Sequence, residues 1–455
     1  MTISLPPAIA DALTRLERAG YEAWAVGGCV RDALRGAAPG DYDLTTAALP
    51  AETEAVFAGE RVIETGIRHG TVTVLLAGQP VEITTFRIDG AYTDARRPDA
   101  VHFTRSLRED LARRDFTVNA MAYSPARGLA DPFGGQDDLA AGLLRCVGDP
   151  DTRFSEDALR IMRAVRFASA LDFTLDPPTA AAALRHRDAL RAVSPERISA
   201  ELVKLLCGPG VRRVLSEHID LLAPVLPELA LQKNFDQHHP CHIYTALEHT
   251  AAAVEAIAPT PTLRLAALLH DIAKPACFTR DAAGTGHFYG HPERGAEMAD
   301  AILRRLRFDT ATRERVTLLV RWHDRPIEPT APAVRRALNR LGEEAFFQLI
   351  ALKRADNFGQ GEVLRYRQRE YDALERIAKE ILAENQCLSL RTLAVNGETL
   401  RRCGVAPGPE MGRLLQSALN AVLDGDIPNE KNAILGRLGL TEKETAPCAS
   451  TDCKK

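Results

Sequence analysis

The sequence has no apolar run long enough to cross a bilayer, and its first twenty residues show neither the basic segment nor the apolar segment of a secretion signal. Its nine cysteines are scattered singly without a CxxC pair, and their number is odd. A disulfide framework or a structural zinc site would need paired or regularly spaced cysteines. These absences predict a soluble cytoplasmic protein that has no membrane partner.

The chain is also poor in net charge and, in its first part, in lysine. The formal net charge is only −4, which by itself argues against a nucleic-acid partner, although a balanced total can hide a basic groove beside an acidic site. The first lysine is Lys204, so arginine is the only permanently charged cation before it. Codon usage accounts for much of this bias, but arginine also has a planar fork that binds phosphate through two hydrogen bonds.

Strand-like segments are confined to the first part of the chain. "YEAWAV", "DYDLTT", "GTVTVLL" and "VEITTFR" carry β-branched or alternating apolar residues. After Gly134 and Gly135 the pattern becomes helical and rich in Ala, Leu, Arg and Glu. A chain of 455 residues predicts roughly two to four domains. We therefore expect an α+β protein, with a small N-terminal sheet domain and an extended all-α body, and a mobile loop at 89–100.

The stretch "AVGGCVRDALRGAAPGDYDLTT", residues 25–46, ends with two aspartates one residue apart in an expected strand. The strand period of two points Asp41 and Asp43 to the same face, where their charges repel unless a cation lies between them. Mg²⁺ is commonly held by one or two carboxylates together with phosphate oxygens of the substrate. The pair therefore predicts a magnesium site beside a phosphate-bearing substrate.

The same stretch has a glycine pair where a strand turns into a short helix. Because they lack a Cβ atom, Gly27 and Gly28 let the backbone approach a triphosphate and present N–H groups to it. Arg31 follows within one turn and can reach the phosphates, and Asp32 is expected to brace the turn. The lysine of a GxxxxGK[ST] loop is absent, so a P-loop is excluded.

The ordered combination of strand, Gly-Gly, Arg-Asp, Asp-x-Asp and strand resembles the signature of the polymerase-β-like nucleotidyltransferases, in the branch that holds tRNA nucleotidyltransferases (CCA-adding enzymes) and bacterial poly(A) polymerases. The resemblance implies a third carboxylate on a neighbouring strand, for which Glu82 is the candidate, with an outward-facing edge residue as the alternative. It also implies two-metal phosphoryl transfer, in which Mg²⁺ activates an RNA 3′-hydroxyl and binds the triphosphate.

"LREDLARRDFTVNAMAY" resembles the second motif of that family. The resemblance implies that Arg113 and Arg114 face phosphates. It also implies that Asp115 accepts a hydrogen bond from a ribose 2′-hydroxyl, the group that distinguishes an NTP from a dNTP. Asn119 is assigned to the sugar or the phosphate, with a structural cap as the alternative.

In "FSEDALRIMRAVRFA", Asp157 and Arg160 are three residues apart, which makes them neighbours on one helical face. A carboxylate that accepts from an exocyclic amine and a guanidinium that donates to a ring acceptor would admit CTP and ATP and reject UTP and GTP. The EDxxR pattern resembles the protein template of class II tRNA nucleotidyltransferases, and a plain surface ion pair is the alternative. Arg163 and Arg166 are assigned to nucleotide binding, with contacts to an RNA acceptor stem as a second role.

Two later segments resemble the same family. "SPERISAELVKLL" resembles its last motif, which implies that Arg197 and Glu201 brace the template helix. "VNGETLRRCGVAPGPEMG" resembles the C-terminal segment of bacterial CCA-adding enzymes, which implies binding to the elbow of an RNA.

A constellation of histidines and aspartates lies between these two segments. Its order, H, HD and D, resembles the HD metal-dependent phosphohydrolases. Four residues match the metal ligands of that family: His249, His270, Asp271 and Asp356. His291 and His323 are candidates for a second metal or for phosphate binding. An imidazole–carboxylate set suits a transition metal such as Mn²⁺, Fe²⁺ or Ni²⁺. Such a domain either hydrolyses phosphoesters or only packs, and both roles stay open.

These motifs predict a division of the chain into five parts. They are a catalytic head (1–150), a neck that selects the base and contacts RNA (151–232), an HD domain (233–365), a helical RNA-binding segment (366–442) and a disordered tail (443–455). The expected function is template-independent addition of CCA to tRNA 3′ ends from CTP and ATP. A poly(A) polymerase, or an enzyme that adds only C or only A, shares these motifs. An HD phosphohydrolase with a non-catalytic RNA-binding head is the alternative from another class.

Overall fold

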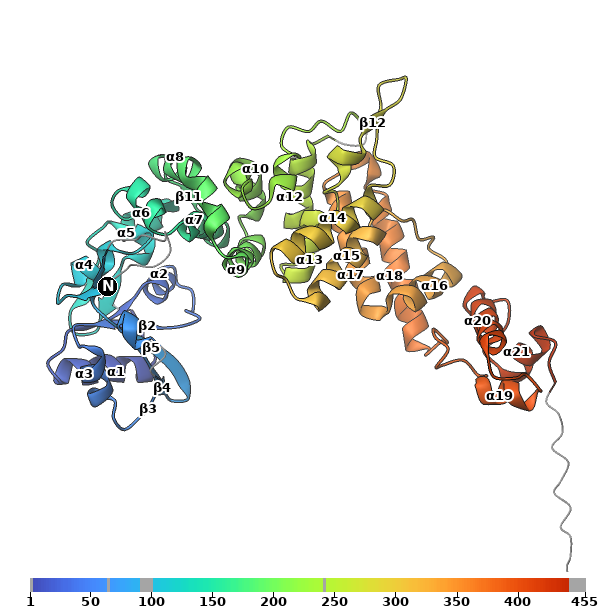
Figure 1. Ribbon diagram of the computed structural model, residues 1–455, viewed down its shortest axis with the longest axis horizontal. Coiled ribbons are helices and arrows are strands. Elements are labelled where there is room, and N and C mark those ends of the chain that lie inside the picture. Colours follow the sequence, from blue (N-terminus) through green and yellow to red (C-terminus); the bar gives the residue numbers. More distant parts are fainter. Residues whose placement is uncertain (1–2, 64–65, 91–100, 240–242, 442–455) are drawn as a thin grey trace, which may run out of the picture.

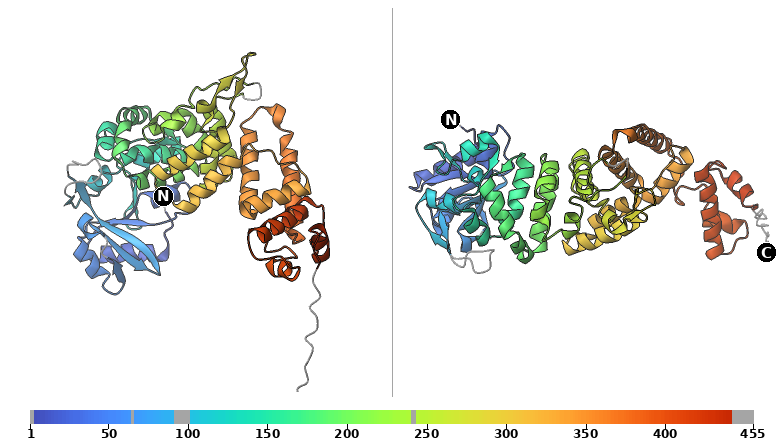
Figure 2. Two further views of the ribbon diagram at one scale, coloured as in Figure 1. Left: turned by 45° about the vertical axis from the view of Figure 1, so that its right-hand side comes forward. Right: turned by 90° about the horizontal axis from the view of Figure 1, so that it is seen from above.

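The computed structural model describes residues 3–63, 66–90, 101–239 and 243–441. A sheet-containing head, a helical neck, a helical body and a small C-terminal module follow one another in an extended arc (Figure 1). The further views in Figure 2 show the head and the C-terminal module at opposite ends. The expected α+β organisation, a mixed sheet followed by helices, is confirmed. The loop expected at 89–100 lies from residue 91 onward outside the described residues, as does the tail at 443–455.

The head is built on one mixed sheet of seven strands in the order β3-β4-β5-β2-β1-β8-β9. All of β1 is buried, and β4 and β5 alternate in burial, as strands with one face on a core do. Helix α1 contributes Ile9, Leu13 and Leu16 to that core. The bounds are α1 Pro7–Arg18, β1 Ala23–Val26, α2 Gly28–Leu34, β2 Asp43–Thr46, α3 Pro50–Val56, β3 Arg61–Ile63, β4 Thr71–Leu76, β5 Gln79–Thr85, β8 Ala122–Ser124 and β9 Gly128–Ala130.

Strand β2 lies at the centre of the sheet. It pairs antiparallel with β1 and parallel with β5, in a register that sets Asp43 opposite Val26 on one side and Glu82 on the other. The chain leaves β1 directly into α2, so this turn and the start of β2 lie at the same edge of the sheet. Further elements of the head are β6 Arg87–Asp89, β7 Val101–Phe103, α4 Leu107–Ala112, α5 Gly135–Ala141 and β10 Leu143–Leu144.

The neck consists of α6 Pro150–Glu156, α7 Leu159–Leu171, α8 Pro177–His186, α9 Pro195–Leu206, α10 Val211–Leu222 and α11 Pro227–Ala230. The three-residue spacing predicts that Asp157 and Arg160 share one helical face, and the structure corrects this. Asp157 is extended, with φ −139° and ψ 105°, at a break between α6 and α7. Its Oδ1 accepts the Leu159 N–H at 3.0 Å, and such capping competes with continuation of a helix.

The body consists of α12 Ala246–Ala256, α13 Pro261–Leu269, α14 His291–Arg305, α15 Thr310–Trp322, α16 Ala331–Leu341, α17 Glu343–Phe358 and α18 Arg367–Ala383. One hydrophobic cluster extends from Phe116 in the head through the neck to Ala355 in α17. The neck and the body therefore share a core, which holds the neck helices firmly beside the head.

The C-terminal module contains α19 Gly397–Arg402, α20 Pro409–Asp424 and α21 Lys431–Arg437 around a small core of its own. Arg335 of α16 donates to the Leu423 carbonyl oxygen at 2.7 Å, and Arg336 forms an ion pair with Asp424. These contacts attach the module to the body. Throughout the described ranges, every helix falls short of the length and apolarity that a bilayer span requires.

Candidate functional site

The two aspartates of the 25–46 stretch line a cavity of about 480 Å³ at the junction of head and neck. Asp43 is the first residue of β2, and Asp41 precedes the strand. Both line this cavity together with Gly27 and Gly28. The structure thus brings the carboxylate pair and the glycine turn to one space.

The acidic groups around Asp43 repel one another. Burial and the negative charges of Asp41 and Glu82 raise the pKa of Asp43 to about 6, against the opposing effect of Arg114. Glu82 lies beside Asp43 on β5, but its side chain is exposed and is not part of the cavity lining. Within the described part of the chain, the oxygen atoms of these three carboxylates do not all lie within 4.8 Å of one another. A divalent cation beside these carboxylates would offset their repulsion.

The turn after β1 requires glycine at its first position. Gly27 has a φ of +78°, and a Cβ atom there would lie 3.0 Å from Arg114 Nη1. Its N–H donates to the Met121 carbonyl oxygen at 3.2 Å and so extends the pairing of β1 with β8. The expectation that both glycines present N–H groups to a triphosphate is therefore corrected for Gly27, whose N–H serves the fold.

A series of charged hydrogen bonds connects α2 with α7 along one wall of the cavity. Arg31 donates two hydrogen bonds to Asp32, at 2.8 and 2.9 Å, and a third to Asn119 Oδ1 at 2.7 Å. Asn119 donates to Asp115 Oδ1 at 3.1 Å, and Arg163 donates to Asp115 Oδ2 at 2.7 Å. Asp32 thus braces Arg31, and Asn119 links Arg31 to Asp115.

Asp115 stays ionised within this network. Burial alone would raise its pKa, but the charge of Arg163 and the hydrogen bonds from Asn119 and Arg163 lower the pKa to about 2. The carboxylate also accepts the Phe116 backbone N–H at 2.8 Å. It is therefore an acceptor at every physiological pH, which is the property that a contact with a ribose hydroxyl requires.

Arg113 and Arg114 depend on an aspartate that the motif comparison did not single out. Asp110 is fully buried in α4, and it lies 2.8 Å from Arg113 and 3.6 Å from Arg114. Against the raising effect of burial, the charges of the two arginines lower the pKa of Asp110. The spacing of three and four residues in "DLARR" is the sequence signal that could have identified this anchor.

The two expected template residues form ion pairs with partners of their own. Asp157 Oδ2 lies 3.1 Å from Arg197 Nη2, and Arg160 forms an ion pair with Glu156. Arg160 also donates to the Arg113 carbonyl oxygen at 2.9 Å, and this bond joins the neck to the head. Both side chains line the cavity. Arg197 therefore braces Asp157 from α9, as the last motif implies.

Cationic side chains outnumber anionic ones around this cavity. The cations are Arg31, Arg113, Arg114, Arg160, Arg163, Arg166, Arg197 and Lys204, and the anions are Asp41, Asp43, Asp115 and Asp157. Such a lining attracts a polyanion. Lys204 and Phe167 also line the cavity and were not predicted. Lys204 lies two turns after Arg197 on α9, so helical spacing could have revealed it, whereas Phe167 has the sequence character of a core residue.

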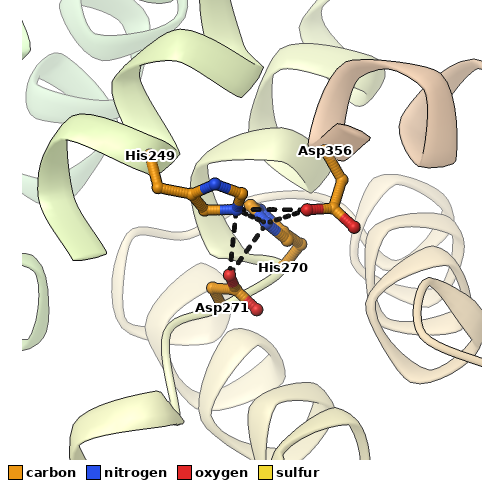
Figure 3. Close-up of side chains that lie close together, drawn as sticks. All are labelled: His249, His270, Asp271 and Asp356. Carbon is orange, nitrogen blue, oxygen red and sulfur yellow. Dashed lines mark hydrogen bonds and ion pairs between the residues drawn. The ribbon is translucent and has the colours of Figure 1, made fainter. Parts of the chain in front are cut away.

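In the body, side chains from α12, from the end of α13 and from α17 converge on one point (Figure 3): His249, His270, Asp271 and Asp356. His249 Nε2 lies 3.1 Å from each of three atoms: His270 Nε2, Asp271 Oδ2 and Asp356 Oδ1. The Nδ1 atoms of His249 and His270 are hydrogen-bonded to the carbonyl oxygens of Gly359 and Ala267, at 2.8 and 2.7 Å. Such bonds orient the Nε2 atoms of both rings toward a shared ligand.

The carboxylates in this cluster favour positive charge. Against the lowering effect of burial, Asp271 and Asp356 raise the pKa of His270 to about 10, and they also raise the pKa of His249. Two imidazole nitrogens and two carboxylates that lie this close together form a donor set for a divalent metal ion. The residues present therefore fit a metal.

A second imidazole pair lies on the other side of Asp271. The Nε2 atoms of His291 and His323 are each 3.5 Å from Asp271 Oδ1 and 3.3 Å from each other. Their Nδ1 atoms are hydrogen-bonded to the carbonyl oxygens of Phe288 and Val320, at 2.8 and 2.6 Å. Asp271 thus lies between two imidazole pairs that are oriented in the same manner.

Three protein-family models match this chain. The Poly A polymerase head domain matches residues 23–145. The model described as "Probable RNA and SrmB- binding site of polymerase A" matches residues 172–232, and tRNA nucleotidyltransferase domain 2 matches residues 293–438.

The chain also resembles whole proteins. The CCA-adding enzyme of Levilactobacillus brevis is 36% identical over 428 residues, which cover 93% of this chain and 95% of that enzyme. The CCA-adding enzyme of Limosilactobacillus reuteri is 34% identical over 460 residues, which cover 98% and 100% of the two chains. The crystal structure of the Bacillus stearothermophilus CCA-adding enzyme in complex with CTP is 29% identical, with a TM-score of 0.71, and the match covers 96% of this chain and 98% of that one.

The sheet domain with its acidic, arginine-lined cavity defines a nucleotidyltransferase, an enzyme that transfers a nucleotide from a nucleoside triphosphate. The similarity to whole relatives extends over nearly the entire chain and includes the neck and the body. The chain belongs to the family of CCA-adding enzymes.

Proposed function

We propose that this chain adds CCA to the 3′ ends of tRNA from CTP and ATP, without a nucleic-acid template, in the cavity between head and neck. The observation that carries this proposal is the presence of Asp41 and Asp43 in one cavity with eight cationic side chains. Carboxylates suit Mg²⁺, and cations suit a triphosphate and an RNA backbone. The Thermotoga maritima CCA-adding enzyme, whose structure holds tRNA, shares the fold at 19% identity.

Asp41 and Asp43 hold Mg²⁺ in this proposal, and Glu82 on the adjacent strand is the third carboxylate. Bound there, Mg²⁺ would supply Lewis-acid activation of the RNA 3′-hydroxyl and neutralisation of the charge on the departing pyrophosphate. The support is the strand register, which sets Asp43 beside Glu82, and the raised pKa of Asp43, which reflects burial and the repulsion from Asp41 and Glu82 that a cation would offset.

The side chains around the carboxylates bind and orient the nucleotide. Arg31, Arg113 and Arg114 bind the triphosphate, and Gly28 lies close to it in the turn. Asp115 accepts the ribose 2′-hydroxyl, and Asn119 holds Arg31 in line with Asp115. These groups are fixed to one another before any ligand arrives, and such preorganisation favours transfer.

Asp157 and Arg160 select the base. A carboxylate acceptor beside a guanidinium donor matches the amine and the ring acceptor of cytosine and adenine, while uracil and guanine present the opposite pattern. Arg197 holds Asp157 from α9, and Glu156 holds Arg160 within the neck. A pair held in this way presents one pattern to both accepted bases.

The remaining parts of the chain bind tRNA in this proposal. Arg163 and Arg166 line the neck side of the cavity, where they serve the nucleotide and the RNA end. The neck at 151–232 and the segment at 366–442 contact the body of the tRNA through phosphate and shape. The match of residues 172–232 to an RNA-binding model supports the neck assignment. We place this work in the cytoplasm.

The test uses purified protein, Mg²⁺ and a tRNA that lacks its 3′ CCA. The four NTPs are supplied singly and together, and the products are sequenced. Addition of CCA followed by arrest is the expected result. A long A tail would make the chain a poly(A) polymerase, and a stop after C alone or A alone would make it a partial enzyme. Complete failure to extend the tRNA would overturn the proposal.

The histidine clusters favour a second activity, that of an HD metal-dependent phosphohydrolase within residues 233–365. His249, His270, Asp271 and Asp356 would hold a transition metal such as Mn²⁺, Fe²⁺ or Ni²⁺, and the metal would supply Lewis-acid activation of water and of a phosphoester. His291 and His323 offer ligands for a second metal across Asp271. Phosphatase assays with Ni²⁺ or Mn²⁺ test this activity, and equal rates for the native protein and Asp271→Ala would refute it.

A further inference from the structure

Three arginines of the cavity share one aromatic ring. The guanidinium carbons of Arg31, Arg163 and Arg166 lie 5.2, 5.3 and 3.4 Å from the centroid of the Phe167 ring. Arg31 comes from α2 in the head, and the other two come from α7 in the neck. The face of an aromatic ring attracts cations, and the attraction grows where water is excluded. Phe167 is 5% exposed and lines the cavity, so its ring meets these conditions.

The ring is itself held in place. Phe116 is fully buried and meets the Phe167 ring edge-on, with centroids 5.8 Å apart and planes at 79°. Phe167 belongs to α7 and to the hydrophobic cluster that the neck shares with the body. A ring packed in this way keeps its plane and presents a fixed face to the guanidinium groups.

Each of the three arginines also has an ion-pair partner. Arg31 is paired with Asp32, Arg163 with Asp115, and Arg166 with Glu201, whose Oε2 lies 2.8 Å from Arg166 Nε. Arg31 and Arg163 are also linked to each other through Asn119 and Asp115, whereas Arg166 is held by Glu201 of α9. Cations this close repel one another. The ring is a single surface that attracts all three.

We propose that Phe167 is a positioning residue for the incoming nucleotide, which holds the guanidinium groups of Arg31, Arg163 and Arg166 at the spacing that receives the triphosphate. The inference rests on the proposed function of the cavity. Because every NTP carries the same phosphates, the contribution of the ring is equal for CTP and ATP and independent of base selection. Because these arginines contact the triphosphate before transfer begins, loss of the ring changes KM more than kcat.

Phe167→Leu tests the inference, because leucine keeps an apolar side chain and removes the ring face. CTP incorporation is measured on tRNA without CCA, and ATP incorporation on tRNA that ends in CC. We expect KM to rise about tenfold for both nucleotides and kcat to change less than about threefold. The preference over UTP and GTP should not change. Phe167→Tyr retains the ring face and should restore KM to within about twofold of the native value.

Phe173→Leu is the matched control. Phe173 belongs to the same hydrophobic cluster, is 7% exposed, and has a single arginine, Arg35, at 5.5 Å from its ring, outside the cavity lining. Its replacement should lower the melting temperature and leave KM unchanged. If Phe167→Leu does not fold, Phe167→Met, which is closer in volume, carries the same expectation.

An unchanged KM in Phe167→Leu would overturn the inference, and so would an equal rise in KM in Phe173→Leu. A folded Phe167→Tyr variant as defective as Phe167→Leu would overturn it as well. Failure of the native protein to incorporate either nucleotide refutes the proposed function instead, so the two failures are distinguishable.

Discussion

The two polar sites of this chain differ in how they balance charge. The head cavity has a volume of about 480 Å³ and combines eight cationic side chains with four aspartates. The cluster in the body is compact and largely buried, and the ligand atoms within each of its two groups all lie within 4.8 Å. A wide cavity with excess positive charge suits a large polyanion, whereas a close set of nitrogen and oxygen ligands suits a small cation. Aspartates occur in both, and their neighbours decide what each site can bind.

The largest expected effect is a loss of nucleotide addition that leaves the cluster in the body unchanged. Asp43→Asn keeps the shape of the side chain and removes its charge, so we expect nucleotide addition to fall by at least about a thousandfold, because a metal ligand is lost. The metal content of the body should not change. Asp32→Asn is the control, since Asp32 pairs with Arg31 but does not itself line the cavity. Loss of the Asp32 charge should lower the rate of nucleotide addition less than about tenfold. Residual activity of Asp43→Asn within tenfold of the native rate would contradict the metal assignment in the head.

The converse experiment targets the body. His270→Ala removes a central ligand, so metal affinity of the cluster should fall at least about a hundredfold, while CCA addition stays within about twofold. Plasma mass spectrometry of the purified proteins measures the metal. Chelation should lower the melting temperature of the native protein and not that of the variant. His186→Ala, which removes a histidine paired with Asp151 in the neck, serves as the control. Full metal occupancy in His270→Ala would refute the cluster as a metal site.

A smaller effect concerns selectivity within the head. Asp157→Asn replaces an acceptor with a group that can also donate, so discrimination of CTP against UTP should fall by about 10- to 100-fold. The ratio of kcat/KM values for the two nucleotides measures this change. Asp151→Asn is the control, because Asp151 pairs with Arg185 on the outer side of the neck. Unaltered selectivity in Asp157→Asn would show that the base is read elsewhere.

The smallest effect is a property of the metal-free head. Asp43 has a pKa of about 6, compared with 3.8 for an unperturbed carboxyl, partly because of the charge of Asp41. Asp41→Asn should therefore lower the pKa of Asp43, and carbon NMR of the carboxyl group can follow the shift. Because its pKa is raised, Asp43 binds a proton more readily in the folded chain than in the unfolded chain. The resulting stabilisation is present at low pH and is lost as the pH rises through about 4 to 6. Because Asp43 borders an open cavity where water screens its charge, the loss should be below about 1 kcal/mol, and Asp43→Asn should slightly raise the melting temperature at neutral pH. A titration of Asp43 that is identical in Asp41→Asn would show that the two carboxylates do not interact.

The parts of the head site that local sequence predicts are those within residues 25–46. Strand and turn patterns are short-range, so the strand at Asp43 and the turn at Gly27 follow from the local sequence, whereas Asp41 precedes the strand and strand alternation does not account for its position. The prediction for Asp157 was wrong in its local geometry. A spacing of three residues implies a shared helical face. The hydrogen bond from the Leu159 N–H and the ion pair with Arg197, forty residues further on, instead hold Asp157 in an extended conformation.

Other members of the site were missed for a physical reason. Phe167 is buried, and in a sequence it cannot be distinguished from a core aromatic, whereas the spacing of Asp110 from Arg113 and Arg114 offered a signal. Their roles become visible only once the arginines around them have been placed. The Gly27 N–H is a similar case, because its bond to Met121 depends on the pairing of β1 with a strand that lies nearly a hundred residues further on.

The amino-acid sequence by itself determined the class of fold, the carboxylate pair and the arginine-rich motifs, because each of these depends on neighbours within a few turns of chain. The order of the histidines and aspartates from His249 to Asp356 could likewise be followed along the chain through its resemblance to a known family. The tertiary structure alone decided which of them meet. The convergence of Arg31 and Arg163 on Phe167, and the position of Asp271 between two imidazole pairs, join elements that are far apart in the chain. Contacts of that kind depend on how whole helices and strands pack, and no local pattern encodes them.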